Sequence, residues 1–141
     1  TAPSPGGGGA IACMEMAIEE ARISTGAIGY INAHGTSTPL NDMAEAEAIA
    51  KLFGSPGPPV SSTKGITGHA LGAAGALEAI AVIMAIQHSL LPPNAGYATR
   101  DPDMPDLNLV HGGPLAWEPA PALSNSFGFG GHNGCLVIGP A

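Results

Sequence analysis

The stretch SSTKGITGHALGAAGALEAIAVIMAIQ, residues 61–87, decides how this chain folds. Its second half predicts a helix that is apolar on nearly every side, because small and aliphatic residues fill almost all of its positions. One carboxylate, Glu78, stands in the middle of that helix, and Lys64 and His69 precede it in a glycine-rich run. A carboxylate inside an apolar helix is costly unless it is paired. Lys64 is therefore the expected partner of Glu78.

This expected ion pair could be purely structural, fixing the loop to the helix, or it could belong to a functional site. The other cations are expected on exposed helix faces or in a proline-rich loop: Arg22, Lys51 and Arg100. His69 is expected near the N-terminus of the apolar helix. The helix dipole disfavours an imidazolium there, which predicts a neutral, hydrogen-bonding imidazole.

The composition indicates one domain whose surface is partly covered by something else. The 141 residues are 45% apolar, enough for a real core, but only 11% are charged, well below the usual quarter. Much of the chain is therefore expected to contact a partner subunit or another part of the same protein. The net charge is −7 with four cations, so no basic patch is possible and nucleic acid is not an expected partner.

The two cysteines and the longest apolar run indicate the cellular compartment of the protein and whether it enters a membrane. Cys13 and Cys135 form no disulfide framework, which predicts a reducing, cytoplasmic setting, and no signal peptide is visible. The longest apolar run, residues 70–86, is short for a membrane span and contains Glu78. We expect a buried helix and no membrane insertion. The five histidines are widely spaced, so no metal site is expected.

Helical and strand patterns alternate along the chain and predict an α/β domain with a mostly buried sheet. Residues 1–9 are expected to be a loop or a truncated end, and residues 10–141 the domain. Besides the apolar helix, which should end near residue 87 or 88, helices are predicted at 10–23 and 43–53. Residues 89–106 should form an ordered loop. Strands are predicted at residues 27–33, 60–63, 107–110, 122–125 and 135–138.

Two further polar stretches follow predicted strands. In HGTSTPLND, residues 34–42, His34 leaves a strand end, where ligands and catalytic groups gather in α/β folds, and this favours a functional role. The hydroxyls and Asp42 could merely cap the next helix, and for Asp42 we favour that reading. In NSFGFGGHNG, residues 125–134, the glycines could expose backbone N–H groups as an oxyanion hole needs. Taken alone, that stretch is more typical of a tight hairpin.

In this order, HGTSTPLND, STKGITGH with its small-residue helix, and NSFGFGGHNG resemble the C-terminal half of a beta-ketoacyl-(acyl-carrier-protein) synthase. The nearest match is to the type II elongating enzymes of fatty acid synthesis, and LLPPNAGYATRDPDM also fits. The resemblance implies the C-terminal half of a thiolase-like fold. That half is a mixed sheet of about five strands with helices on both faces, and the apolar helix lies in the shared central layer.

The resemblance also implies an acyltransferase reaction, a decarboxylating Claisen condensation that elongates acyl chains with malonyl-acyl carrier protein in fatty acid or polyketide synthesis. His34 and His69 match the paired histidines that stabilise the enolate. Lys64 matches the family lysine, and Glu78 the glutamate that pairs with it. Phe129 matches a gating aromatic whose backbone N–H completes the oxyanion hole. Matching residues in supporting roles are two pantetheine-binding hydroxyls and a structural acid: Thr36, Thr38 and Asp42.

The family's nucleophilic cysteine lies upstream of anything in this sequence, and neither Cys13 nor Cys135 fits its place. The chain is therefore expected to be a fragment or one half of a split enzyme, inactive alone. The implied partners are acyl carrier protein, the N-terminal half and, in the complete protein, a second copy. No cofactor is implied beyond the carrier's phosphopantetheine.

Two other functions stay open at this point. One is a non-catalytic partner subunit resembling a chain-length factor, and the other is a stand-alone acyl-pantetheine binding module. Retention of His34, Lys64 and His69 favours the enzyme.

Overall fold

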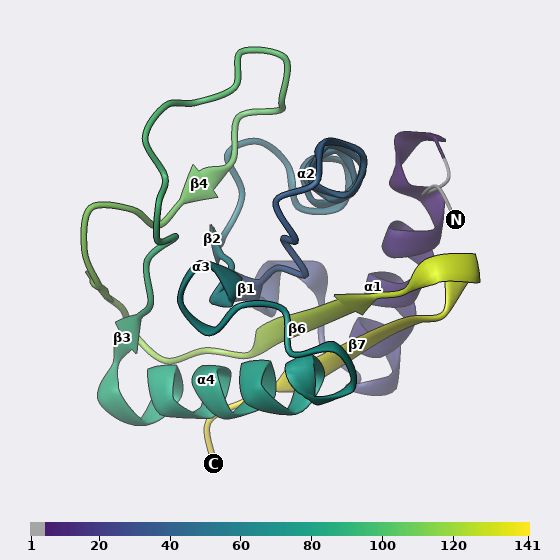
Figure 1. The fold of residues 1–141 in the computed structure, drawn as a ribbon. Helices are drawn as coiled ribbons and strands as arrows, with labels where there is room; N and C mark the ends of the chain where they lie inside the picture. The colour runs from purple at the N-terminus through teal and green to yellow at the C-terminus, as the bar shows by residue number, and fades with distance from the viewer. Residues whose placement is uncertain (1–4) are drawn as a thin grey trace.

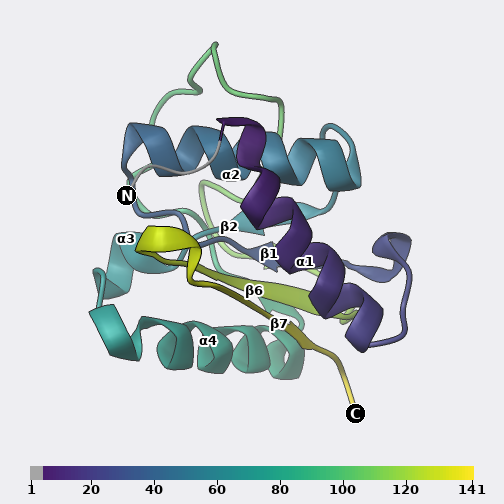
Figure 2. The ribbon, with the colours of Figure 1, turned by 90° about the vertical axis from the view of Figure 1, so that its right-hand side faces the viewer.

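The computed structural model describes residues 5–141, and residues 1–4, part of the expected terminal loop, lie outside it. A five-stranded sheet lies between two helical layers (Figure 2). Helices α1 (Gly8–Glu20) and α2 (Pro39–Phe53) cover one face, and α4 (Ala74–His88) packs on the other. The α/β prediction with helices on both faces is confirmed.

The sheet is mixed, with strand order β4-β2-β1-β6-β7. The first four strands run parallel, and β7 pairs antiparallel with β6. In the middle of the sheet Ile31 lies opposite Val60 on one side and Leu123 on the other. The five strands of this sheet are β1 (Tyr30–Asn32), β2 (Pro59–Ser61), β4 (Asn108–Leu109), β6 (Ala122–Phe127) and β7 (Asn133–Ile138).

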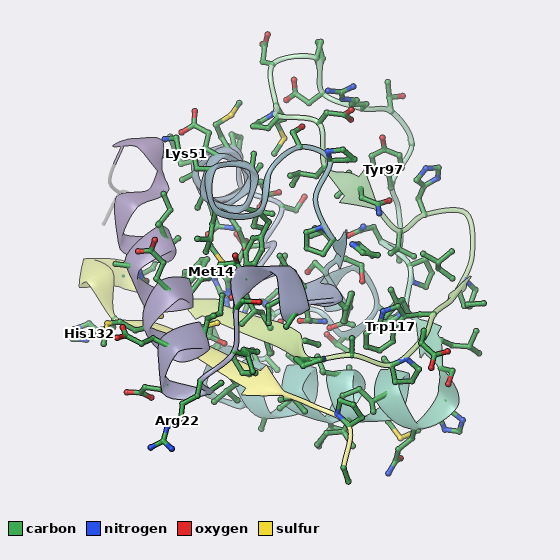
Figure 3. The ribbon with its side chains drawn as sticks, turned by 180° about the vertical axis from the view of Figure 1, so that it is seen from behind. Met14, Arg22, Lys51, Tyr97, Trp117 and His132 are labelled. Carbon is green, nitrogen blue, oxygen red and sulfur yellow. The ribbon has the colours of Figure 1, made fainter. Side chains whose placement is uncertain are left out.

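Successive side chains of the central strands point to opposite faces of the sheet, so the interior consists of two hydrophobic cores. Ile31 of β1 belongs to the core under α1 and α2, and its neighbour Tyr30 belongs to the core against α4. Figure 3 shows Met14 between α1 and the sheet, where it is fully buried. Lys51, at the far end of α2, donates to the carbonyl of Gly6 at 2.8 Å and ties the first described turn to that helix.

Several boundaries differ from the sequence predictions. Helix α2 begins at Pro39 instead of residue 43, because proline suits the first helical position, where its missing N–H costs nothing. Two two-residue strands, β3 (Leu90–Leu91) and β5 (Leu115–Ala116), form an unpredicted small sheet. A long loop between β3 and β4 projects from the body (Figure 1). Short helical turns occupy Pro5–Gly7, Thr25–Ala27, α3 (Lys64–Thr67), Leu71–Ala73 and Phe129–Gly131.

The apolar helix α4 is buried on one face only, so the prediction of a buried helix is only half right for this chain. Glu78 and Val82 face the sheet and are almost completely buried. The outer face of α4 is 43–56% exposed and consists of Leu77, Ile80, Ile83 and Met84. By length and composition alone, residues Leu71–His88 would suffice to cross a membrane, and 22% of them are buried inside the structure. The buried share includes Glu78 and Val82, which face the sheet.

Candidate active site

His34 comes from the carboxyl end of β1, as the sequence predicted, and its side chain is 8% exposed. The chain turns sharply after it, because Gly35 has a φ of +42°. A Cβ at that position would lie 2.6 Å from the Cβ of Ser62, so only glycine fits both the backbone angle and the space. The glycine therefore fixes where the imidazole of His34 leaves the sheet.

His69 reaches the same place from a different segment, the loop between α3 and α4. Its ring centroid lies 5.5 Å from that of His34, with the rings nearly perpendicular at 85°. The Nδ1 of His69 accepts a hydrogen bond from the backbone N–H of Leu71 at 3.2 Å. In a neutral imidazole the proton is then on Nε2, which becomes the donor.

His69 does not lie in the first turn of α4, contrary to the expectation from the sequence, because this helix begins only at Ala74, after the turn Leu71–Ala73. A helix dipole acts mainly within the terminal turn. The contact from Leu71 is therefore the feature of the structure that orients this imidazole.

Lys64 and Glu78 form the predicted ion pair, between α3 and the middle of α4. Both side chains are buried, at 6% and 2% exposure, so this is an interior pair with little solvent screening. Glu78 uses only Oε1 in this contact, and its Oε2 has no hydrogen-bond partner among the described residues. The pair fixes the short helix that leads into His69.

The surroundings of His34 keep it uncharged. Burial, the positive charge of Lys64 and the neighbouring His69 together lower the pKa of His34 from 6.5 to about 4. Its ring also packs near Phe127, with centroids 6.1 Å apart. The Nδ1 of His34 is buried and has no hydrogen-bond partner within residues 5–141, so no contact there fixes its tautomer.

Both histidines line a cavity of about 1030 Å³. Thr36 and Thr38 also line it, and their hydroxyls bond each other at 2.9 Å. Thr38 precedes α2 but makes no side-chain cap bond, so its predicted capping role is wrong. Phe129 lies at the rim with 79% of its surface exposed.

Asp42 and Lys64 line a second cavity of about 1020 Å³, which shares Thr36 and His69 with the first. The structure thus brings the predicted site residues together around two adjoining hollows, with Glu78 behind them. The capping role favoured for Asp42 is wrong, because α2 already begins at Pro39 and no side chain caps it. Asp42 lies within the first turn, where its backbone N–H bonds to the carbonyl of Thr38 and its charge suits the helix dipole.

The glycine-rich stretch after β6 is a hairpin, since β6 and β7 pair from Phe127 opposite Asn133 onward. Its turn needs glycine, because Gly130 and Gly131 have φ values of +73° and +80°. Figure 3 shows His132 at the tip of this hairpin, pointing away from the body. The same turn also lines the first cavity. The stretch is therefore a tight hairpin and can at the same time face a ligand.

Glu45 is a site residue that was not predicted from the sequence. Its carboxylate is buried behind His34 and accepts hydrogen bonds from the backbone N–H groups of His34 and Gly35, both at 2.9 Å. The spacing of α2 could have revealed it, because Glu45 shares a helix face with the buried Ala48 and Ile49. Within the described part of the chain, no group of three His, Cys, Asp or Glu residues could hold a metal ion.

The chain is similar to known proteins in both sequence and fold. The family described as "Beta-ketoacyl synthase, C-terminal domain" matches residues 1–98. The 3-oxoacyl-[acyl-carrier-protein] synthase 2 of Synechocystis is 46% identical over 140 residues, covering 98% of this chain and 33% of that protein. The chain therefore spans about a third of the length of this curated relative.

Two solved structures have the same fold. The ketosynthase ApeO in complex with its chain length factor ApeC, from Xenorhabdus doucetiae, matches with a TM-score of 0.91 and 43% identity, over 100% of this chain and 35% of that one. A type II polyketide synthase acyl-carrier protein in complex with its ketosynthase, AntDE:AntF, matches with a TM-score of 0.91 and 36% identity, over 99% of this chain and 35% of that one.

Proposed function

This chain belongs to the beta-ketoacyl synthase family, as its C-terminal domain, and we propose that it supplies the enolate-stabilising half of a decarboxylating Claisen condensing site. The observation that carries the proposal is the meeting of two imidazoles, His34 and His69, at one cavity. The complete enzyme would elongate acyl chains in fatty acid or polyketide synthesis with malonyl-acyl carrier protein.

The two histidines act on the malonyl thioester. When its carboxylate leaves as CO₂, the electron pair passes to the adjacent carbon and onto the thioester oxygen as an enolate. The Nε2–H of His69, set by the Leu71 contact, donates to that oxygen, and His34 donates beside it. Donors placed in advance stabilise charge that develops only in the transition state. The carbanion then attacks the acyl thioester on the cysteine of the N-terminal half.

A neutral donor suits this step because it stabilises the enolate without quenching it by full proton transfer. The low pKa of His34, about 4, keeps that imidazole uncharged at neutral pH. The positive charge of Lys64 contributes to that low pKa. The carboxylate of Glu78 balances this charge in the interior by forming an ion pair with Lys64. The ion pair thus serves the histidines by its charge and by holding α3.

The remaining residues take supporting roles. Thr36 and Thr38 line the cavity with hydroxyls suited to the amides of a pantetheine arm. The backbone N–H at Phe129 would complete the oxyanion hole for acyl loading, and Asp42 supports the start of α2. We expect acyl carrier protein as partner, a homodimer of the complete enzyme, no cofactor beyond the carrier's own pantetheine and a cytoplasmic reaction.

A chain-length-factor-like partner subunit is the second candidate, favoured by the match to a ketosynthase solved with its chain length factor. Such a subunit would bind acyl chains without turnover. It would have no use for two imidazoles placed together near a buried lysine, so CO₂ release distinguishes the two functions.

The test uses a reconstituted enzyme, defined as this chain joined to an N-terminal part that carries the cysteine, its own or that of the Synechocystis relative. His69→Ala should lower CO₂ release from malonyl carrier protein by about 10²–10³-fold, the usual cost of losing one such donor. Acyl transfer to the cysteine should persist, because it relies on the backbone N–H at Phe129.

The matched control is His88→Ala, an exposed histidine at the end of α4, which should change neither step. Wild-type CO₂ release in His69→Ala would refute the assignment of His69. A reconstituted wild-type protein that binds acyl chains but releases no CO₂ would instead support the partner-subunit function.

A further inference from the structure

Ser62 lies directly after β2, between the two segments that carry the histidines. Its hydroxyl donates a hydrogen bond to the carbonyl of Gly35 at 3.0 Å and accepts one from the backbone N–H of Lys64 at 3.3 Å. Gly35 follows His34 in the turn after β1, and Lys64 begins α3, the short helix that leads into His69. One side chain therefore links both segments, and a hydroxyl suits this place because it both donates and accepts.

The contact between Ser62 and the turn is also close. A Cβ on Gly35 would lie 2.6 Å from the Cβ of Ser62 and 2.8 Å from its Oγ, so the two residues touch directly. The strands that precede them are paired, with Asn32 of β1 opposite Ser61 of β2, and the backbone N–H of Ala33 donates to the carbonyl of Ser61 at 2.9 Å. The spacing of the two segments is therefore set by the strand ends and continues through Ser62.

Asn94, in the loop between β3 and β4, holds Ser62 from the other side. Its Oδ1 accepts a hydrogen bond from the backbone N–H of Ser62 at 2.8 Å. Its Nδ2 donates to the carbonyls of Val60 at 3.2 Å and Val110 at 3.0 Å, and its backbone N–H donates to the carbonyl of Val110 at 2.8 Å. An amide supplies the acceptor and both donors that these contacts need, which neither a carboxylate nor an aliphatic group can do. Asn94 thus bridges β2 and the residue that follows β4.

The residue next to Asn94 supports α3 as well. A Cβ on Gly65, in α3, would lie 2.7 Å from the carbonyl oxygen of Ala95, so the backbone of the loop rests against this helix. Ser62 and Asn94 both line the second cavity, whereas the two histidines meet at the first. An effect of Ser62 or Asn94 on the histidines therefore has to pass through the backbone.

We propose that Ser62 and Asn94 are positioning residues for the condensation. Ser62 sets the spacing of the two segments that carry His34 and His69, and Asn94 acts through Ser62. The inference rests on the proposed function for its effect on rate, but the effect on the two segments is independent of that function. Removal of either side chain should slow decarboxylation and leave carrier binding and cysteine loading intact, because both histidines would be misplaced while the remaining site residues stay.

The experiment measures Ser62→Ala, Asn94→Ala and the double variant in the reconstituted enzyme. Ser62→Ala removes both hydroxyl bonds and little volume. It should lower kcat for CO₂ release by about 10- to 100-fold, since small misplacements of a catalytic group cost rates of that order. KM for malonyl carrier protein and acyl loading should stay near wild type. Asn94→Ala should also lower kcat, and the double variant should lose less than the product of the two single losses, because residues that act through one another are not additive.

The matched control is Ser55→Ala. The hydroxyl of Ser55 donates to the carbonyl of Asp106 and so holds the same loop at its other end. Ser55→Ala therefore loosens the loop without removing the contacts of Ser62, and its CO₂ release should equal that of the wild type.

Amide hydrogen exchange supplies a readout that needs no activity. Peptides covering residues 34–38 and 63–70 should exchange faster in Ser62→Ala than in wild type or Ser55→Ala, while peptides from α1 stay unchanged. If exchange instead rises throughout the molecule in step with a fall in Tm, and acyl loading falls together with kcat, Ser62 is merely structural and the proposal is overturned. This measurement decides the role of Ser62 even if Asn94→Ala does not fold.

Wild-type CO₂ release in Ser62→Ala would overturn the proposal equally, and so would single losses that simply multiply in the double variant. If the wild-type reconstituted enzyme releases no CO₂, the proposed function fails. Exchange at residues 34–38 and 63–70 then still decides whether Ser62 holds the two segments.

Discussion

At the scale of single residues, the two histidines are controlled by their surroundings in different ways. His34 is buried, and its low pKa comes first from loss of solvent, then from Lys64 and His69. His69 is exposed, and a backbone N–H from Leu71 occupies its Nδ1. A site built this way depends on the backbone around each ring, which makes the neighbours of the histidines as important as the rings.

The titration of His34 can be measured directly. We predict that NMR of histidine-labelled reconstituted enzyme will show His34 titrating with a pKa of about 4, well below its ordinary 6.5. In the double variant Lys64→Met, Glu78→Leu the pKa should rise but stay below 6.5, because burial, the largest cause, remains. A wild-type titration at 6.5 or above would contradict this account.

The same shift has a consequence for stability. Between pH 6.5 and about 4 the unfolded chain binds a proton at His34 that the folded chain does not, so the folded state gains stability as pH rises through this window. The contribution of His34 is complete above pH 6.5 and is lost as pH falls towards 4.

Glu45 shows why sequence reasoning stopped short at this scale. The motif residues His34, Lys64 and His69 were predicted from their chemistry and position in the chain, and the structure brings them together. Glu45 stands among alanines in DMAEAEA, where charged residues usually form a solvated helix face. Its role depends on backbone N–H groups of a distant turn, which carry no sequence signal.

At the scale of elements, the site depends on the joint between α3 and α4. The two helices are linked covalently by a loop and non-covalently by the buried Lys64–Glu78 pair. Tight backbone packing adds to this, since a Cβ on Gly65 would lie 2.7 Å from the carbonyl of Ala95. The joint between α3 and α4 therefore has little freedom to move, and this also restricts the movement of His69, which lies in the connecting loop.

We predict that Glu78→Ala in the reconstituted enzyme costs about 3–5 kcal/mol of stability, because it leaves the charge of Lys64 buried without a partner. Urea unfolding measures this cost. The double variant Lys64→Met, Glu78→Leu should recover part of the stability but none of the CO₂ release. The control is Glu47→Ala on α2, for which a small change is expected. An unaltered unfolding midpoint in Glu78→Ala would show that the pair contributes nothing to the fold.

The elements differ in how well the sequence predicted them. All five strands of the main sheet and the three main helices were expected, although the patterns at residues 107–110 and 122–125, which became β4 and β6, are short and only partly apolar. Strands β3 and β5 were not, since two-residue strands carry no pattern and pair only through tertiary contacts. The exposed outer face of α4 agrees with the resemblance, which places this helix in a layer shared with the other half of the enzyme. The apolar pattern alone predicted a buried helix, because it does not show whether the cover belongs to this chain.

At the scale of the whole molecule, charged residues are few and a large part of the exposed apolar surface lies on one helix. Only 11% of residues are charged, and the outer face of α4 exposes four large apolar side chains in one continuous stripe. Exposed apolar stripes of this kind mark interaction surfaces. The family resemblance implies that this helix belongs to a central layer shared with the other half of the enzyme.

We predict that the 141-residue chain, studied alone, self-associates through the outer face of α4. Sedimentation velocity should show dimers or larger species, and an apolar dye should bind. Ile80→Glu with Met84→Lys places a favourable i, i+4 pair on that face and should yield a monomer with less dye binding. The control, Met16→Glu, removes an isolated apolar residue that is 62% exposed on α1 and should leave association unchanged. A wild-type chain that sediments as a single monomer without binding dye would contradict the prediction. If the same face also receives the N-terminal half, the double variant should fail to reconstitute CO₂ release although its own fold is intact.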